Sequence, residues 1–478
     1  MPSLLDFSNE TLYHIIEKIS PSDILNFALC CSDLHRLAQK TLEMHGSWKQ
    51  AYTSVVLRGC HRHPKRSHPL QLIRDICMDW RVGEFPKVLK VECCDKYEYN
   101  DGESDNEEQH EESRIWRGED SRTVTKLMAG IDGDIKDMAL APGFLPSSEV
   151  DDLCSLIRSG HKDAMIGLLL LLLPNLESIC FEGYSWKADE LSKIVAAIAS
   201  PDLRGRPGSK LLTKLSQIEV DTFSSFRGGE NLALLTQFAA LPSMRTLVGS
   251  HVKAFHNDPE IWRFGSRTSN VTEIIFQNIS RVTVALLRRI LSGINALKRF
   301  TYDHFVGSHA DSPMKAHRII GALLEHAKDS LEYLALTGDS NTHDVEEDNH
   351  SNNGSLQGFT VLKDVVLPSE IYVDRAPYEC EFPPDADMYG RRPQDAVRDI
   401  VDILPPSIET VKLDGGYQLR YIGKQLANLP DEMDLRFPEL NKITILTKSY
   451  YGVSRVWTEC LTKAYDRKGM KLEVVEEN

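Results

Sequence analysis

Apolar residues near the start of the chain fall into three short helical stretches. The first stretch begins near Asn9, a residue type that favours helix N-termini. Its apolar residues repeat at the i, i+3, i+4, i+7 spacing that places side chains on one helix face: Leu12, Ile15, Ile16 and Ile19. The pattern therefore predicts an amphipathic helix with an almost purely aliphatic face.

Two further start signals follow this stretch. Ser20-Pro21-Ser22-Asp23 offers a capping serine, a proline suited to the first helical position and an acid suited to the first turn. The apolar residues after it are Ile24, Leu25, Phe27, Ala28 and Leu29. A third start at Ser32 leads to Leu34, Leu37, Ala38 and Leu42. Three helices this short have little surface to bury among themselves, so we expect a partner or the rest of the chain to cover these faces.

The rest of the chain contains a recurring phrase with apolar residues at its first, fourth and sixth positions. This spacing predicts a turn that leads into a short strand with one buried face. The copies begin 26 to 46 residues apart from Leu176 onward. The clear copies are Leu176/Ile179/Phe181, Leu215/Ile218/Val220, Val271/Ile274/Phe276, Leu297/Phe300/Tyr302, Leu331/Leu334/Leu336, Leu362/Val365/Leu367, Ile408/Val411/Leu413 and Leu440/Ile443/Ile445. A damaged copy is Met244/Leu247/Gly249, and weaker candidates are Ile135/Met138/Leu140 and Val88/Val91/Cys93.

Helical patterns lie between these phrases. They cover Ala188–Ala199, Leu232–Leu241, Val282–Ile294, Ala316–Ala327 and Ala396–Leu404. The alternation of strand and helix predicts an α/β fold, and its recurrence favours a curved solenoid in which each unit buries its apolar side against its neighbours. An ordinary α/β domain built from βαβ units would produce the same alternation.

Three segments have the composition of loops or disordered chain: 95–112, 338–354 and 376–393. The first is strongly acidic, the second is rich in Asp, Asn, Ser and His, and the third is rich in proline. We therefore divide the chain into an N-terminal helical domain at 1–50, a connecting region at 51–130 and the solenoid at 131–478.

Composition narrows the classes of partner. The chain has 478 residues and a formal net charge of -15, which disfavours nonspecific binding to nucleic acid or to anionic membranes. Its ten cysteines are scattered and the N-terminus does not resemble a signal peptide, so we expect a cytoplasmic or nuclear protein. The apolar run Met165–Leu173 is too short to span a bilayer and is expected to be a buried helix.

Candidate chemistry is sparse. Cys60, His61 and His63, with His68 and Cys77 nearby, could supply metal ligands. Their spacing matches no standard zinc pattern, so a basic loop is the better interpretation and we expect no metal and no cofactor. The sequence contains no phosphate-binding glycine loop, dinucleotide fingerprint, nucleophile elbow or His-Glu-x-x-His motif. An enzymatic function therefore has little support.

The repeated phrase resembles that of leucine-rich repeats. The asparagine ladder of that family is nearly absent, with Asn278 the only tempting copy, so another device must satisfy the backbone. In such a solenoid the residues between the apolar strand positions would line the concave face. Acids recur at the strand exits, at Glu182, Asp221, Asp303 and Asp414. We hypothesise a strip that prefers a basic target segment, although an ordinary solvated acidic surface would show the same residues.

The N-terminal segment resembles the F-box. The family pattern has a Leu-Pro-x-Glu entry, an aliphatic helix, a Ser-x-x-Asp/Glu-Leu turn and a final helix that begins at a cysteine. Here Phe7-Ser8-Asn9-Glu10, then LYHIIEKI, then SPSDILNFALCCSDLHRLA occupy those places. Phe7 and Ser8 depart from the usual Leu-Pro, which weakens the rigid entry to the first helix.

This resemblance implies docking to the Skp-family adaptor of a cullin-RING ubiquitin ligase. The adaptor-binding residues it implies are Leu5, Phe7, Ser8, Glu10, Leu12, Ile15, Ile16, Ile19, Ile24, Leu25, Leu29 and Leu34. An F-box joined to leucine-rich repeats is a common architecture of substrate receptors. We therefore expect a non-enzymatic receptor that holds a protein target for ubiquitin transfer by other subunits.

The alternatives differ in the role of the N-terminal helices. In a stand-alone leucine-rich scaffold or inhibitor-like binding protein, these helices would only cap the solenoid. A hydrolase or transferase of the α/β class is a third and weaker alternative.

Overall fold

The structure is a computed structural model, and it divides into two compact units, residues 1–245 and 246–478. It describes residues 4, 7–58, 68–92, 128–140, 146–183, 189–200, 211–222, 231–252, 265–279, 282–305, 315–338, 354–368, 371, 399–414, 426, 429–430, 432, 435–448 and 455–477. The segments 95–112 and 376–393, residues 339–353 of the segment 338–354, and Cys60, His61 and His63 lie outside these ranges.

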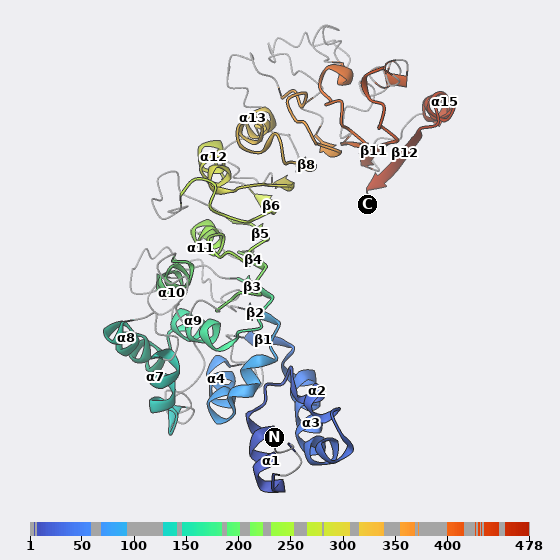
Figure 1. The fold of residues 1–478 in the computed structure, drawn as a ribbon. Coiled ribbons are helices and arrows are strands. Elements are labelled where there is room, and N and C mark those ends of the chain that lie inside the picture. The colour runs from blue at the N-terminus through green and yellow to red at the C-terminus, as the bar shows by residue number, and fades with distance from the viewer. Residues whose placement is uncertain are drawn as a thin grey trace. The chain divides into compact units, whose positions relative to one another are not determined.

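The first unit begins with three helices and continues with four strands separated by helices (Figure 1). Its elements are α1 (Asn9–Lys18), α2 (Ile24–Ala28), α3 (Ser32–Tyr52), β1 (Ser54–Arg58), α4 (Pro69–Met78), the 3-10 helix η3 (Trp80–Glu84), β2 (Val88–Glu92), α7 (Asp132–Leu140), α8 (Ser147–Arg158), α9 (Lys162–Leu172), β3 (Ser178–Glu182), α10 (Asp189–Ala199), β4 (Gln217–Asp221) and α11 (Asn231–Phe238). Strands β1 to β4 pair in parallel and in chain order, without register shifts.

The second unit repeats this arrangement. Its elements are β5 (Thr246–Ser250), β6 (Glu273–Ile279), α12 (Val284–Gly293), β7 (Arg299–His304), α13 (Ala316–Ala327), β8 (Tyr333–Gly338), β9 (Asp364–Leu367), the 3-10 helix η9 (Ile400–Asp402), β10 (Thr410–Asp414), β11 (Lys442–Lys448), α15 (Arg455–Asp466) and β12 (Lys471–Glu477). Strands β5 to β12 also pair in parallel and in chain order. The predicted α/β class is therefore confirmed.

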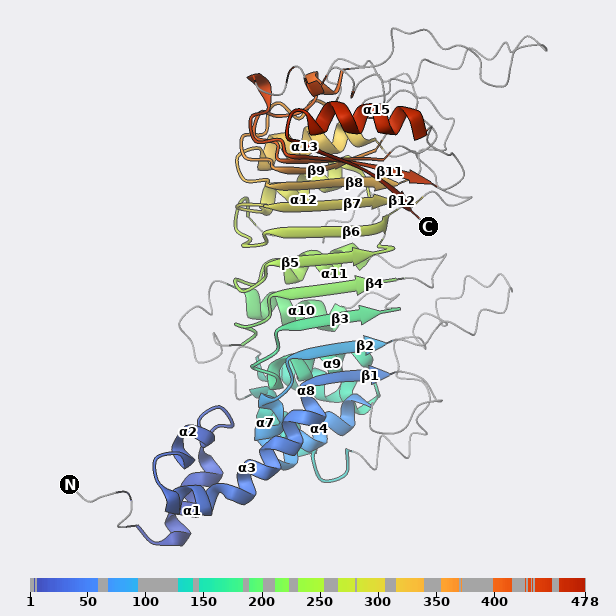
Figure 2. The same ribbon diagram turned by 90° about the vertical axis from the view of Figure 1, so that its right-hand side faces the viewer.

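Helices cover one face of each parallel sheet. In Figure 2, α9 and α10 lie behind strands β2 to β4, and in the second unit α12 lies behind β6 and β7. The strand residues on the covered face are buried apolar side chains, such as Ile179 and Phe181 in β3. The run Met165–Leu173 forms the buried helix α9 together with its flanking residues, as predicted. Among the described residues, no helix is both long and apolar enough to cross a bilayer.

All eight clear copies of the phrase become strands β3, β4 and β6 to β11, and the damaged copy leads into β5. Of the two weaker candidates, Ile135/Met138/Leu140 is wrong because it lies in helix α7. Val88/Val91/Cys93 does coincide with strand β2, but the frame is displaced: Leu89 and Val91 are the buried residues and Val88 is exposed. The sequence analysis missed β1 and β12. Because β1 and β2 fall within 51–92, the predicted connecting region already contributes to the parallel sheet.

Successive turns are joined by a recurring set of backbone hydrogen bonds just before each strand. For example, the N–H groups of Glu332 and Tyr333 both donate to the carbonyl of Lys298 at 2.8 and 3.0 Å, and those of Glu409 and Thr410 donate to Lys363 at 2.7 and 2.9 Å. Equivalent pairs join Lys87 to Thr53 and Ser178 to Lys87 in the first unit. These bonds pair backbone groups at the start of each strand with the preceding turn.

Polar side chains directly before the first apolar position add a second link between turns. Ser330 and Ser407 each donate at 2.8 Å to the carbonyl of the first apolar residue of the preceding copy, Leu297 and Leu362. In the first unit, Ser243 donates to the carbonyl of Leu212 at 2.8 Å and the Asn175 amide donates to that of Glu84 at 2.8 Å. We call these four residues the turn ladder.

Candidate docking surface of the N-terminal helices

Of the three N-terminal helices, α1 and α3 begin after a residue whose side chain caps them, whereas α2 has no side-chain cap. Ser8 precedes α1 and its hydroxyl accepts from the Thr11 N–H at 3.4 Å, so the capping residue is Ser8 and the predicted start at Asn9 is the first helical residue. The Cys31 sulfur accepts from the Leu34 N–H at 3.5 Å at the start of α3. Between them, the Ser20 hydroxyl donates to Asp23 at 2.9 Å and stabilises the turn that precedes α2. The serine start signal thus forms a turn and α2 begins at Ile24.

The helices bury a small core of their own. It consists of Leu12, Ile16, Ile24, Ala28, Leu34, Leu37 and Ala38, with Ile15, Ile19, Phe27, Cys31 and Leu42 packed around it. The helices therefore bury more among themselves than their length led us to expect, and Leu12, Ile16, Ile24 and Leu34 are covered within the three helices. Their side chains hold the helices together and are not available to an adaptor, because contact between α1, α2 and α3 already removes them from water.

A different set of apolar side chains remains in solvent. Leu25 is 53% exposed and Leu29 is 66% exposed. They stand four residues apart at the start and the C-cap of α2, so they share one helix face. We call these two residues the α2 face. Phe7, just before α1, and Tyr13, within it, are also about half exposed. Tyr13 was not predicted from the sequence because it lies outside the aliphatic stripe.

The remaining residues implied by the resemblance have mixed roles. Ser8 is occupied as a cap, and Glu10 is exposed with its pKa lowered by a hydrogen bond from Ser8. Ile15 and Ile19 are half-buried against the core. Leu5 lies outside the described residues. The exposed apolar part of the implied set is therefore Phe7, Leu25 and Leu29.

Helix α3 connects these helices to the sheet. Its 21 residues end at Tyr52, directly before β1. The Tyr52 hydroxyl donates to Asp75 in α4 at 2.8 Å, and the buried His45 ring stacks on Trp48 and meets Phe85 edge-on. Burial lowers the pKa of His45, and the nearby Arg81 charge acts in the same direction. One continuous helix thus carries the N-terminal core at one end and packs on the sheet layer at the other.

The acids predicted to form a target-binding strip are divided between the units. Glu182 and Asp221 are register partners on β3 and β4 of the first unit, whereas Asp303 and Asp414 lie in the second. Lys90 contacts Glu182 at 2.7 Å and Glu92 at 3.0 Å, and Arg58 contacts Glu92 at 2.7 Å. The hydrogen bonds of Lys90 to Glu182 and Glu92 raise the pKa of Lys90, and the bond to Glu182 has the larger effect. Glu182 therefore belongs to a mixed-charge network on the open sheet face.

Asp303 is also engaged within the protein. Its carboxylate accepts from the Asn278 N–H at 3.2 Å and from the Thr337 hydroxyl at 2.7 Å. Asn278 has a φ of 54°, so Asp303 serves the backbone at the register shift of β6 rather than an unpaired acidic strip. Glu182 and Asp303 are thus paired within the protein, and the preference of these acids for a basic target segment stays a prediction.

The candidate metal ligands within the described chain have structural places. His68 accepts from the Leu70 N–H at 3.1 Å and caps α4, and burial lowers its pKa to about 4. Cys77 lies in the last turn of the same helix. No group of three or more His, Cys, Asp or Glu residues in the described ranges could hold a metal ion.

Comparison with known proteins adds no family to this description. No family model matches the chain, and no curated protein sequence matches it.

Proposed function

We propose that this protein is the substrate-recognition subunit of a Skp-cullin-F-box ubiquitin ligase. The observation that carries the proposal is the α2 face, where two large aliphatic side chains remain in water beside an otherwise complete core. Two exposed leucines on one helix face would form the apolar part of a surface that a partner covers. They fall within the segment whose sequence resembles the F-box, so the partner would be a Skp-family adaptor and, through it, a cullin.

The second part of the proposal is that the repeated strands are degenerate leucine-rich repeats that hold the protein target. Parallel pairing in chain order, helices on one face and the recurring bonds between turns support this assignment. The open sheet face would contact the target, with the network of Arg58, Glu92, Lys90 and Glu182 on its first strands. The receptor would act by positioning, because raised effective concentration accelerates transfer without a catalytic group of its own.

The test is co-purification with a Skp-family adaptor, comparing the natural chain with Leu25→Asp/Leu29→Asp. Burial of each leucine is worth about 1.5–3 kcal/mol, so the double variant should lose adaptor binding by about 100-fold or more. The variant should fold, because both side chains are exposed. Ile16→Asp is unsuitable as a probe because it would place a charge in the core of the three helices.

The matched control is His35→Asp/Gln39→Asp. These residues are also exposed and four apart, but they lie on α3. This control variant should bind the adaptor as the natural chain does. The proposal is contradicted if the α2-face variant binds the adaptor as well as the natural chain does. It is also contradicted if neither the natural chain nor any variant binds the adaptor although circular dichroism shows that all are folded. The second result would favour a stand-alone repeat protein in which the helices only cap the sheet.

A further inference from the structure

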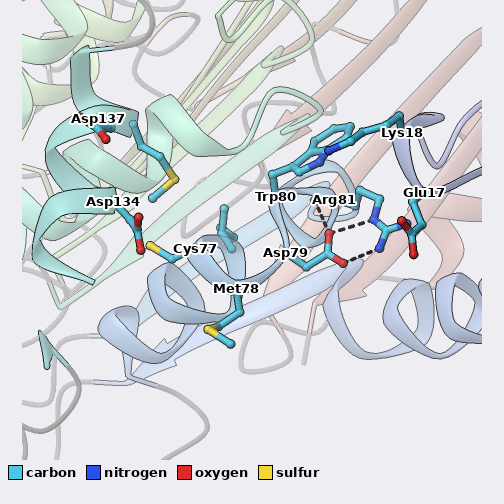
Figure 3. Close-up of a pocket in the computed structure, with 11 residues that line it drawn as sticks. Glu17, Lys18, Cys77, Met78, Asp79, Trp80, Arg81, Asp134 and Asp137 are labelled. Atoms are coloured by element: carbon cyan, nitrogen blue, oxygen red, sulfur yellow. Dashed lines mark hydrogen bonds and ion pairs between the residues drawn. The ribbon is translucent and has the colours of Figure 1, made fainter. Parts of the chain in front are cut away.

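A groove lies on the first unit, and none of its lining residues belongs to the α2 face (Figure 3). Its volume is about 440 Å³, and it runs between the end of α1 and helix α7, with the end of α4 and the start of η3 between them. Figure 3 shows Asp134 and Asp137 of α7 on one side and Trp80, Arg81 and Lys18 on the other. The size is within the range of sites that accept a small ligand or a few side chains.

Large apolar side chains are exposed along this groove. Met78 is 77% exposed and Trp80 is 47% exposed, although both neighbour well-buried residues of the α4–η3 segment. Met138 of α7 also lines the groove. Trp and Met are enriched at protein interfaces, and thioethers adapt to partners of different shape. The groove thus offers an apolar seat that the described part of the chain leaves open.

Only some of the charged residues that line the groove are paired with a residue of opposite charge. Arg81 is forked onto Asp79 through contacts of 2.9 and 2.6 Å, so these two charges offset each other. Glu17 contacts His14 at 3.4 Å. Asp134 and Asp137 are exposed, and among the described residues no ion pair or hydrogen bond involves either carboxylate. The α7 side therefore carries two acids that no described residue pairs with, and the opposite side carries Lys18 and the Arg81–Asp79 pair as well as Trp80.

Asp134 and Asp137 offer two carboxylates, and Met78 and Trp80 offer exposed apolar surface, so a ligand with a cation beside an apolar group would match both features. We propose that the groove binds a segment of a partner protein that carries an arginine or lysine beside a large apolar side chain. The cation would lie against Asp134 and Asp137, and the apolar side chain would cover Met78 and Trp80. An arginine suits both walls, because it pairs with carboxylates through two hydrogen bonds and stacks on an indole.

The same charges argue against a phosphate-bearing ligand, which the carboxylates of α7 would repel. The site shares no residue with the α2 face, so the inference does not depend on adaptor docking. Near Asp134 the Cys77 thiol has its pKa raised to about 11, first by burial and then by the Asp134 charge. The negative field of α7 therefore reaches the apolar part of the groove.

The experiment is selection of a random nine-residue peptide library, displayed on phage, against the full chain. We expect the enriched peptides to contain Arg or Lys within two positions of Leu, Met, Phe or Trp. Synthetic copies should bind at least tenfold more weakly to Asp134→Lys/Asp137→Lys and to Trp80→Ala. Binding to the natural chain should also weaken as salt rises from 50 to 300 mM, because exposed ion pairs are screened.

The matched control is Glu149→Lys/Asp152→Lys, which makes the same change of charge on exposed residues of α8. This control should bind the peptides as the natural chain does, and all variants should retain the natural circular dichroism spectrum. Enriched peptides without a cation, equal loss in the α8 control, or no enrichment at all would overturn the proposal. A change of sedimentation coefficient in the groove variants alone would identify a second copy of the chain as the occupant and would also overturn it.

Discussion

At the scale of single residues, two backbone segments can pack so closely that there is no room for a side chain between them. A Cβ at Gly83 would lie 2.4 Å from the carbonyl oxygen of Leu172, at the C-terminal end of α9. This neighbour is backbone and cannot rotate away. Gly83 therefore lets η3 pack against α9 directly, and it supports the segment that presents Trp80.

The change Gly83→Ala should lower the free energy of unfolding by about 1–3 kcal/mol, because α9 or η3 must move to admit the methyl group. Urea unfolding followed by circular dichroism measures this change. The control is Gly46→Ala in α3, where a Cβ meets nothing within 4 Å. That change should stabilise the protein by up to about 1 kcal/mol, because alanine favours helices. Equal stability of the two variants would contradict this account.

At the scale of elements, the turn ladder explains how the repeats form without a regular asparagine ladder. Ser330 and Ser407 each reach across one turn to a carbonyl of the copy before, and the strands that follow them carry the buried apolar positions. The hydroxyl bond is short-range and needs only one small residue before the first apolar position. Different copies can therefore use Ser or Asn at this place, and the ladder is hard to detect in the sequence.

Replacement of Ser330 or Ser407 by Ala should destabilise the second unit by about 1 kcal/mol each, because a carbonyl between turns loses its side-chain partner. The two effects should add, since the bonds belong to separate turns. Thermal unfolding of both single variants and of the double variant tests this. Ser155→Ala, on the exposed face of α8, is the control and should have no destabilising effect. A double variant as stable as the natural chain would disprove the role of the ladder.

At the scale of the whole molecule, each strand pairs with the strands next to it in the sequence. In the second unit β8 pairs with β7 and β9, so its buried residues share contacts mainly with neighbouring turns. Stability in such an array is a sum of local terms and nearest-neighbour terms. Damage to one strand should therefore spread to its neighbours first.

The change Leu334→Ala removes a fully buried side chain from β8 and should cost about 2–5 kcal/mol. Hydrogen exchange followed by mass spectrometry should show faster exchange in β7, β8 and β9. Strands β1 and β2 of the first unit should keep their natural rates. Leu435→Ala, which alters a side chain that is 86% exposed, should leave exchange unchanged throughout. Uniform acceleration along the chain after Leu334→Ala would show that the protein unfolds as one cooperative unit.

The short-range pattern of the sequence was sufficient for the strands that carry a complete phrase. In each such copy, the three apolar residues at fixed spacing are buried together on one face, so period and burial agree. Helices with a clear apolar stripe, such as α12 and α13, also follow from local pattern. Strands β1 and β12 lacked the phrase and were missed, because their pairing depends on a neighbouring strand.

Only the tertiary structure decided which apolar residues of the N-terminal helices are available. An aliphatic stripe identifies a buried face but does not say whether the chain or a partner buries it. Packing of α1, α2 and α3 removed Ile16 and Leu34 from water and left the α2 face exposed. The groove beside Trp80 likewise needs α7, more than fifty residues further along the chain, to supply its charged wall. Sequence period determined the strands that carry the phrase and the helices with a clear apolar stripe, and contacts between distant segments determined the surfaces.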